Sequence, residues 1–584
     1  MPGSLLGAQI AGLLFFLNPD LPFTPAPVLR SLAIYGGLVG LATLLLHLPF
    51  VWRRPWRARR LLPWGITVSL ALAALLDWAH ASIYTYYLLP GLNVRLIKTA
   101  SWISIASLIA FYTALLHTLR RRPYGKRSRL GFMALVIFSL YIMVERREAF
   151  QPSPPSSPLP STAESRDRSS LLVVGLEGAT LEAVLPLAEQ GHLPFLSRML
   201  QEGAHGRLAS FPPNNETALW TTLASGKYPY HHRALGQRAY AADHLMPGAR
   251  LRLLPLGVGF RFWGLLGASG TGSENADDLP AGSESLRLWE ILPKMGLPAG
   301  VVGWPGGTGG TDQVGPADPV FALGKSFFDH SAARSASRSP DRLPEVADRA
   351  RLFRIRPDDI DPVILSPFGA RPPAVVPQAL TQDLWRETLL LFLLDQHGEL
   401  GAALLHLPGL GAVSRALFGG YAKMQFEGAQ HRDYVQAGEA LTRYYSHLDG
   451  FLADLWARQP GRTILVVVSA YGTSGPRGLR RIVTELAGGR PLEGYVEDSP
   501  DGILLLLGPG IEGGAVLTDA ELVDVVPTVA YGLGLPIARD LDGRILTEAF
   551  ERAFLARHPL TFVPSYETLR DPSGGGIGTV RSLR

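Results

Sequence analysis

The sequence predicts an α-helical membrane domain of about five transmembrane helices, followed by an α/β domain with a mostly parallel sheet between helices. Three observations support this fold class. Long apolar runs fill the first 150 residues, a Pro- and Ser-rich stretch follows, and short apolar segments then alternate with amphipathic ones. The 584 residues suffice for about two to four domains of roughly 100 to 200 residues each.

Five apolar runs predict the transmembrane helices. Most of them approach or exceed the roughly 20 residues that cross about 30 Å of hydrocarbon. The first run lacks a preceding basic segment, so we interpret it as a retained helix and not as a signal peptide. The runs are 4–17, 30–52, 61–89, 99–119 and 130–144.

Basic residues in the short loops predict the orientation of these helices. Five Arg lie at 53–60 and six Lys or Arg at 120–129, whereas the loop on the other side carries only Arg95 and Lys98. The positive-inside rule then places the N-terminus on the cytoplasmic side of the membrane and everything after residue 150 on the outer side. We therefore expect an integral inner-membrane protein with a large extracytoplasmic, periplasmic-type domain.

Asp77 and His80 are the ionisable residues within the predicted helices that first suggest chemistry. Counted from Leu61, Asp77 lies roughly 24 Å along its helix, which is close to the outer interface. Two interpretations stay open: an interfacial carboxylate, or a site for protons or substrate.

Charge is divided unevenly along the chain. Residues 1–150 carry 16 Lys and Arg against 4 Asp and Glu, whereas residues 151–584 carry 39 against 46. The larger part is thus mildly acidic, which argues against a nucleic-acid partner. The chain has no Cys, which excludes disulfides, thiolate metal sites and a thiol nucleophile.

Composition also predicts the domain boundaries. Residues 1–150 form the membrane domain, 151–170 a Pro/Ser-rich linker, 171–570 the α/β domain and 571–584 a flexible tail. Within the α/β domain, 228–400 is Gly-, Ser- and Arg-rich in places and is interpreted as including a cap or insert.

Five short apolar runs predict the strands of the α/β domain. Near-continuous apolar strands separated by helices favour a parallel sheet covered on both faces, in which ligands bind at the carboxyl ends of strands. The residues after three of the strands read GLEGAT, PGLGAVSR and SAYGTSG. The predicted strands are 171–176, 299–303, 402–407, 463–469 and 503–507, with helices at 180–202 and 437–458.

Six segments resemble, in order, the type I phosphodiesterase/nucleotide pyrophosphatase branch of the alkaline phosphatase superfamily over about residues 170–550. They are LLVVGLEGAT, GHLPFLSRMLQEGAHGRL, PPNNETALWTTLASGKYPYHHR, SLRLWEILPKMGLPAGVVGWPG, TILVVVSAYG and the segment from PDGILLLLGPG to LDGRIL. The placement of such a domain after five helices is similar to that of bacterial lipoteichoic-acid synthases and phosphoethanolamine transferases.

The resemblance implies a nucleophilic Thr or Ser between two divalent metals held by about six carboxylate and imidazole ligands. Carried over residue by residue, nearly all of these ligands are missing. The first Asp is Glu177, and the Asp-x-x-x-His pattern is matched by Gly411 and Arg415. The Asp-His pair after the fourth strand reads Ala470 and Tyr471, and the late His falls near Val496.

The position of the nucleophile is ambiguous within PPNNETALW. Thr217 is the nearest hydroxyl and is our catalytic candidate, but Asn214, Asn215 or Glu216 are alternatives for the same position.

Other His and Asp residues are interpreted as structural. His231 and His232 are expected in a loop, His406 in the core, and Asp449 and Asp454 on a solvated helix face. The late acidic residues Asp519, Asp524, Asp540 and Asp542 are expected to cap helices and turns. We expect no His/Asp/Glu cluster to replace the missing metal ligands.

Two functions stay open. The first is a pseudoenzyme without a metal cofactor, a binding or scaffold subunit whose partners are the bilayer and membrane or envelope proteins. In it a vestigial pocket of Glu177, Asn215, Gly411, Arg415, Ala470, Tyr471 and Val496 either binds an anion through Arg415 or is filled by an Arg415–Glu177 pair. The second is an active phosphodiesterase or phospho-head-group transferase on lipids, nucleotides or envelope polymers, with Zn or Mn.

Overall fold

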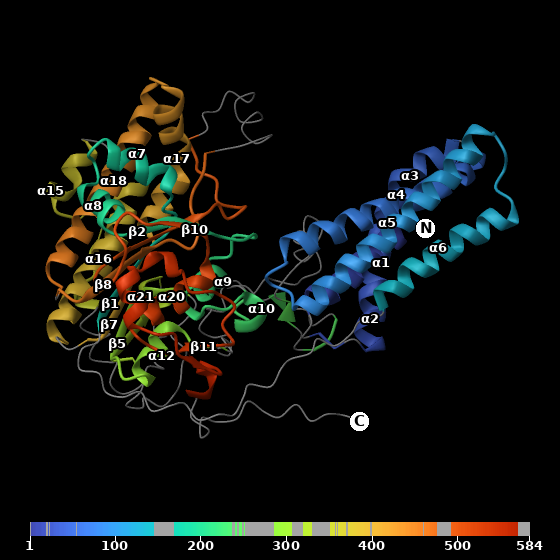
Figure 1. Ribbon diagram of the computed structural model, residues 1–584. Helices are drawn as coiled ribbons and strands as arrows, with labels where there is room; N and C mark the ends of the chain where they lie inside the picture. Colours follow the sequence, from blue (N-terminus) through green and yellow to red (C-terminus); the bar gives the residue numbers. More distant parts are fainter. Residues whose placement is uncertain are drawn as a thin grey trace. The chain divides into compact units, whose positions relative to one another are not determined.

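The computed structural model divides into two compact units, each described by itself (Figure 1). It describes residues 2–144, 169–235, 285–305, 319–329, 351–475 and 492–569 apart from short gaps, together with 240–241, 245–247 and 250–251. The first unit comprises 1–152 and 235–274, and the second comprises 153–234 and 275–584. The predicted linker, except for its last two residues, and the predicted tail lie outside the described residues.

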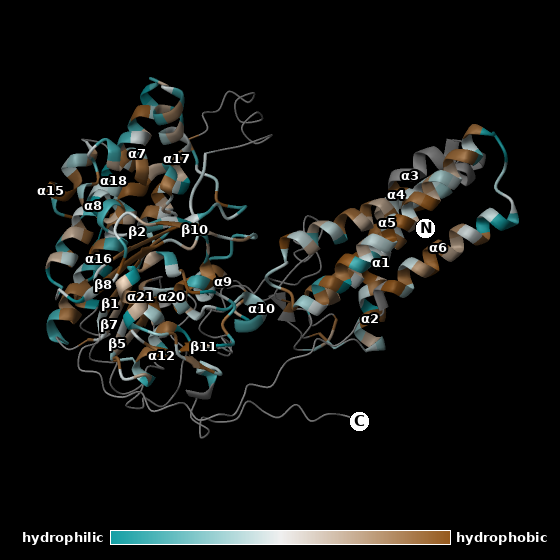
Figure 2. Ribbon diagram, viewed as in Figure 1, coloured by the Kyte–Doolittle hydropathy of each residue, from teal (hydrophilic) through white to brown (hydrophobic). Residues whose placement is uncertain are grey.

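Helices of the first unit cover all five predicted apolar segments, and Figure 2 shows hydrophobic residues along them. Among the described residues, three stretches are long and apolar enough to cross a membrane: Pro25–Leu45, Leu61–Ile83 and Pro90–Leu119. This count is lower than the five predicted from apolar runs, and the first helix, with 16 residues, is shorter than the roughly 20 that cross the hydrocarbon. The helices are α1 (Pro2–Leu17), α2 (Pro25–Ser31), the π-helix η1 (Leu32–Gly36), α3 (Gly37–Arg53), α4 (Pro55–Ile83), α5 (Pro90–Leu119) and α6 (Lys126–Val144).

The packing of these helices suits a lipid environment. Small side chains, among them Ala73, Ala106 and Ala110, are buried where α4 and α5 meet. Large apolar side chains point outward, with Leu75 65% and Leu108 67% exposed. Small residues between helices and large apolar ones outside are the arrangement that a bilayer favours. Asp77 and His80 are buried among the helices, and both interpretations of Asp77 stay open.

The second unit is built on an eight-stranded sheet in the order β10-β2-β9-β8-β1-β7-β5-β6. Its pairings are parallel except that β9 runs antiparallel to β2 and β8, which confirms the predicted mostly parallel sheet. The strands are β1 (Ser170–Leu176), β2 (Ala204–Ala209), β5 (Ala299–Trp304), β6 (Phe321–Gly324), β7 (Ala402–Leu407), β8 (Thr463–Val468), β9 (Gly502–Leu507) and β10 (Val516–Glu521).

Helices cover both faces of this sheet. Alternate strand residues such as Leu172 and Leu405 pack in one cluster with α7 (Leu181–Glu189), α8 (Pro194–Glu202), α16 (Val375–Gln396), α17 (Gly409–Glu427) and α18 (Arg432–Ala457). The other face meets α9 (Glu216–Ser225), because Trp220 lies against Gly175 and His406. The remaining helices are α10 (Pro229–His232), α12 (Leu288–Lys294), α13 (Lys325–Asp329), α15 (Pro362–Leu365), α20 (Val525–Gly532) and α21 (Arg552–Arg557).

The predicted helix at 180–202 is two helices. The first helix, α7, ends at Glu189, and Gly191, with a φ of 78°, lies in the connection to α8, which begins at Pro194. The buried carboxylate of Asp449 accepts hydrogen bonds from the backbone N–H groups of Phe195 (3.0 Å) and Leu196 (2.7 Å). The expectation that Asp449 is solvated is therefore wrong, because it caps the N-terminus of α8.

Candidate functional site

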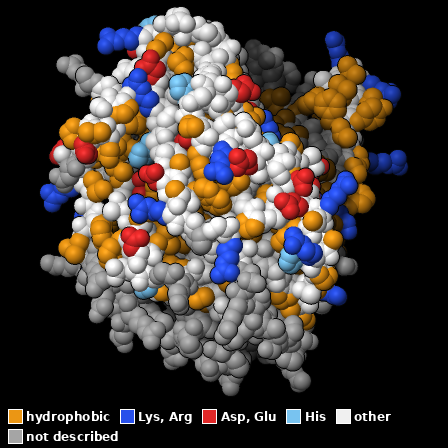
Figure 3. All heavy atoms as spheres, turned by 60° about the vertical axis from the view of Figure 1, so that its left-hand side comes forward, with side chains coloured by type: hydrophobic (Ala, Val, Ile, Leu, Met, Phe, Trp, Pro, Cys, Tyr) orange, Lys and Arg blue, Asp and Glu red, His pale blue; other side chains and the backbone are white. Residues whose placement is uncertain are grey.

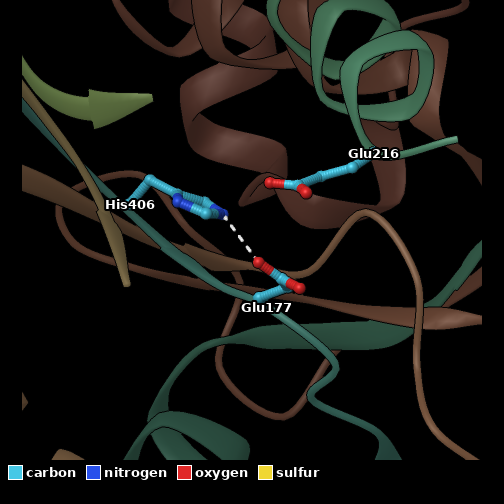
Figure 4. A group of neighbouring side chains, drawn as sticks. All are labelled: Glu177, Glu216 and His406. Carbon is cyan, nitrogen blue, oxygen red and sulfur yellow. Dashed lines mark ion pairs between the residues drawn. The ribbon is translucent and has the colours of Figure 1, made fainter. Parts of the chain in front are cut away.

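The carboxyl ends of β1 and β7 and the start of α9 bring three metal-ligating side chains together. Glu177 follows β1, His406 lies within β7 and Glu216 is the first residue of α9. One potential ligand atom from each lies within 4.8 Å of the others. Figure 4 shows Glu216 and His406 pointing toward Glu177 from two sides. The expectation that no His/Asp/Glu cluster forms is wrong for this geometry.

Glu177 lies at the centre of the site and is 1% exposed. Its Oε1 accepts hydrogen bonds from the Tyr471 hydroxyl (2.6 Å) and from Nη2 of Arg415 (2.7 Å). Gly411 leaves room for this side chain, because a Cβ there would lie 2.7 Å from Cγ of Glu177. Of the two interpretations of Arg415, the structure shows the ion pair with Glu177.

A second ion pair neutralises Glu216. Nζ of Lys325 donates to Oε1 of Glu216, and both side chains are about four-fifths buried. Lys325 begins α13 directly after β6, so it too stands at a strand's carboxyl end. The two carboxylates of the site therefore each have a cation of their own, Arg415 for Glu177 and Lys325 for Glu216.

Burial and these cations have opposite effects on the pKa of Glu177. Burial raises the pKa of Glu177, and the nearby Glu216 carboxylate raises that pKa further. Lys325 and Arg415 act in the opposite direction and favour the ionised form of Glu177. In turn, the Glu177 charge opposes the effect of burial on Arg415, and the pKa of Arg415 is raised.

His406 is fully buried, which confirms its assignment to the core. Its ring packs edge-on against Trp220, with ring centroids 4.5 Å apart, and its Nε2 lies 3.9 Å from Oε2 of Glu177. Neither ring nitrogen has a hydrogen-bond partner among the described residues. Burial holds the pKa of His406 well below its ordinary value, so the imidazole is neutral and able to accept.

The residues around the nucleophile position lie at the start of α9. Asn215 caps this helix, since its Oδ1 accepts from the Ala218 N–H at 3.3 Å. Thr217 is buried, and its hydroxyl has no hydrogen-bond partner among the described residues. It is Glu216, however, whose side chain joins Glu177 and His406, and the catalytic role of Thr217 stays a prediction.

The remaining predicted pocket residues offer packing and backbone contacts. Ala470 is buried at the end of β8. The backbone carbonyl of Val496 accepts a hydrogen bond from Nδ2 of Asn214 at 2.7 Å. Their side chains have no metal-ligating atom, as the sequence comparison indicated.

The site fits a pair of divalent ions poorly. Of the positions carried over from the resemblance, only Glu177 offers a ligand, and two cationic side chains already balance the two carboxylates. Glu177, Glu216 and His406 have donor types suited to one cation, and Oε2 of Glu177 has no partner among the described residues. The ionised site without a metal has no net charge, whereas a metal would add two positive charges to a buried group.

Sequence reasoning missed Lys325 and the convergence of Glu216 and His406 on Glu177. Lys325 follows a four-residue strand inside the region interpreted as a cap. A signal for His406 existed, because strand alternation directs its side chain to the face of α9, opposite Gly175 in register.

The other predicted structural residues have partners. His232 is buried with its Nε2 2.9 Å from the Thr222 hydroxyl, and His231 pairs with Asp542 at 2.9 Å. Asp540 accepts from Lys227 at 2.8 Å, and Asp524 accepts from the backbone of Glu521 and Arg544.

A cavity of about 870 Å³ lies at the same edge of the sheet. Thr180, Arg207, Thr473, Tyr495, Asp498 and Ser499 are among the described residues that line it, and Glu177, Glu216 and His406 are not among them.

Solved structures with a similar chain path include a phosphonate monoester hydrolase from Silicibacter pomeroyi, 15% identical over 67% of this chain and 77% of that one, with a TM-score of 0.33. Another is murine ectonucleotide pyrophosphatase/phosphodiesterase 5 in complex with AMP, 12% identical over 66% of this chain and all of that one, with a TM-score of 0.35. No curated protein sequence matches the chain.

The model of one protein family matches residues 171–484, more than half of the chain. This range begins in the first strand of the sheet and contains Glu177, Glu216, Lys325, His406 and Arg415. The chain belongs to the type I phosphodiesterase / nucleotide pyrophosphatase family.

Proposed function

We propose that this protein is a membrane-anchored pseudoenzyme of its family, a binding or scaffold subunit in a membrane complex. The observation that carries the proposal is the pairing of Arg415 with Glu177 and of Lys325 with Glu216. These two side chains supply the positive charge that divalent metals supply in the chemistry expected of the family.

Electrostatics support a metal-free site. A buried carboxylate is stable as an ion when it has a well-placed cation and further hydrogen bonds, and Glu177 has both in Arg415 and Tyr471. A divalent ion would enter beside two fixed cations, and like charges at such distances repel strongly in a buried site. Metal binding would therefore require Lys325 or Arg415 to move away.

Hydrolysis assays test the absence of catalysis. The full chain, purified in detergent with added Zn or Mn, is expected to leave bis(p-nitrophenyl) phosphate uncleaved above the buffer rate. Thr217→Ala and Glu216→Gln are expected to leave that rate unchanged. Hydrolysis by the wild type that either variant abolishes would overturn the proposal.

The second candidate is an active metal-dependent phosphodiesterase or phospho-head-group transferase on lipids, nucleotides or envelope polymers. It is favoured by Glu177, Glu216 and His406, whose neutral imidazole and unpartnered carboxylate oxygen suit one Zn or Mn ion. Under this alternative His406→Ala abolishes a metal-dependent hydrolysis, whereas His231→Ala, which removes an exposed ion-pairing histidine, does not.

We also propose that the helices anchor the chain in the cytoplasmic membrane with the N-terminus inside and the second unit outside. Loop charge supports this orientation. Acidic and basic side chains are interspersed over the visible face in Figure 3. That pattern gives no support to a nucleic-acid partner. Membrane or envelope proteins stay the proposed partners.

A further inference from the structure

The chain leaves the phosphodiesterase domain after residue 234 and returns to it at residue 275. Residues 235–274, which we term the excursion, belong to the same compact unit as the membrane helices. Its described parts include a short antiparallel pair, β3 (Tyr240–Ala241) and β4 (Arg250–Leu251), in which Tyr240 lies opposite Leu251.

Two leucines of the excursion are buried against the helices. Leu245 is 1% exposed and Leu251 is fully buried. They belong to one apolar cluster with Ile10, Ala11, Leu14, Phe15, Leu21 and Tyr35, against which Leu76 and Met246 also pack. Nη1 of Arg30 donates a hydrogen bond to the Leu245 carbonyl at 3.2 Å. The excursion thus has both apolar and polar contacts with the bundle.

These contacts lie at one end of the bundle. Leu14 and Phe15 are in the last turn of α1, Leu21 is in the connection to α2, and Arg30 is in α2. The described residues Leu245 and Leu251 of the excursion therefore pack at the end of the bundle at which α1 turns into α2.

We propose that the excursion is a non-covalent clasp, by which the bundle binds the phosphodiesterase domain at the α1–α2 turn. The linker is then a second connection and not the sole attachment of the domain. This proposal stands independently of whether the site is catalytic, because it uses none of the site residues.

Cleavage of the linker tests the clasp directly. A protease site placed within residues 153–168 of the full chain separates the bundle from the rest while leaving the excursion on the soluble fragment. We expect the soluble fragment to stay with membrane vesicles after cleavage and a salt wash. In the double variant Leu245→Asp/Leu251→Asp we expect its release, whereas Leu560→Asp, a matched change at an exposed leucine, should leave it bound. Release of the wild-type fragment would overturn the proposal.

Cross-linking gives a readout that does not depend on a destabilising variant. The chain has no Cys, so Arg30→Cys with Met246→Cys places the only two thiols across the contact. A short bismaleimide is expected to join the two fragments after linker cleavage. The control pair is Gly125→Cys with Met246→Cys, in which the first thiol lies in the connection between α5 and α6 of the same unit, and it is expected to give no cross-link. Equal cross-linking of both pairs, or none in the first, would contradict the clasp.

Discussion

Two buried carboxylates near the strand ends of the same sheet are stabilised in different ways. Asp383, on α16, accepts hydrogen bonds from the Gly409 N–H (2.9 Å) and the Tyr444 hydroxyl (2.8 Å). Glu177 also accepts from a tyrosine hydroxyl, but its second hydrogen bond comes from the Arg415 guanidinium. Asp383 is thus held mainly by neutral donors, and Glu177 by a neutral donor and a cation.

The different partners of Asp383 and Glu177 also act differently on the pKa values of the two carboxyl groups. Burial, reinforced by the nearby Glu387, raises the pKa of Asp383 from 3.8 to about 7. At Glu177 burial and Glu216 also raise the pKa, but two cations oppose them. The pKa of Glu177 is raised as well, so the two carboxylates differ in the cations that oppose the increase and not in its direction. The comparison shows that Arg415 and Lys325 provide the positive charge beside the carboxylates of the site.

The largest expected effect is the pH dependence due to Asp383. Because the pKa of Asp383 is higher in the folded state than in the unfolded one, stability should fall as pH rises from about 4 to about 7 and level off above that. Asp383→Asn removes this titration. From about pH 5 to pH 8 the free energy of unfolding of the wild type should decrease by about 2–3 kcal/mol more than that of the variant.

The measurement for Asp383 is the thermal midpoint of the full chain in detergent across this pH range. Asp454→Asn, at an exposed carboxylate on α18, is the matched control and should leave the slope unchanged. If the thermal midpoints of wild type and Asp383→Asn changed equally with pH, Asp383 would stay ionised and the contrast with Glu177 would not hold.

Removal of Arg415 should leave Glu177 with a neutral hydrogen-bond donor and no cation bonded to it, as is the case for Asp383. Arg415→Ala leaves the buried Glu177 carboxylate with only the Tyr471 hydrogen bond. The free energy of unfolding should fall by about 1–3 kcal/mol, a range that allows for solvent screening because the Arg415 side chain is 48% exposed. The pKa of Glu177 should rise further, so the loss of stability should grow as pH rises. Thermal midpoints at about pH 5 and pH 8 check this, and a loss that shrinks with pH would contradict it.

The Lys325–Glu216 pair should give a smaller effect, because both side chains are partly exposed. A double-mutant cycle with Lys325→Met and Glu216→Gln should yield a coupling free energy of about 1 kcal/mol. The coupling should weaken in high salt less than that of a surface pair, since burial limits screening. A coupling near zero would show that Lys325 does not balance Glu216.

The smallest expected effect is at a surface pair. Arg198 and Glu202 lie one turn apart on α8 at 2.7 Å, with both side chains half exposed. Glu202→Ala should change the free energy of unfolding by about 0.5 kcal/mol or less. A loss as large as that of Arg415→Ala would remove the distinction between site pairs and surface pairs.

Much of the sheet could be predicted because its central strands are buried on both faces and are therefore continuously apolar. The predicted strand at Ala402–Leu407 coincides with β7. Strands β2 and β10 were missed because they mix buried with accessible residues and include Arg207 and Asp519. Periodicity in so short a segment does not separate a strand from a loop.

The site could be predicted in part for a related reason. Glu177, Arg415 and Tyr471 follow strand ends, and parallel strands bring those ends to one edge. Lys325 follows β6, a strand too short to recognise, and the side chain of Glu216 depends on where α9 begins. Those two residues complete the charge balance, so the pairing of cations with carboxylates could be found only from the structure.

Metal stoichiometry tests the central claim most directly. The full chain, purified in detergent without chelator and equilibrated with Zn or Mn, is analysed for metal content beside Arg415→Ala, Lys325→Ala and His406→Ala. The account predicts that the wild type binds far less than one metal per chain, and that any gain in binding appears on removal of Arg415 or Lys325. One or two metals per wild-type chain, lost in His406→Ala, would contradict the account and restore an active metal-dependent phosphodiesterase.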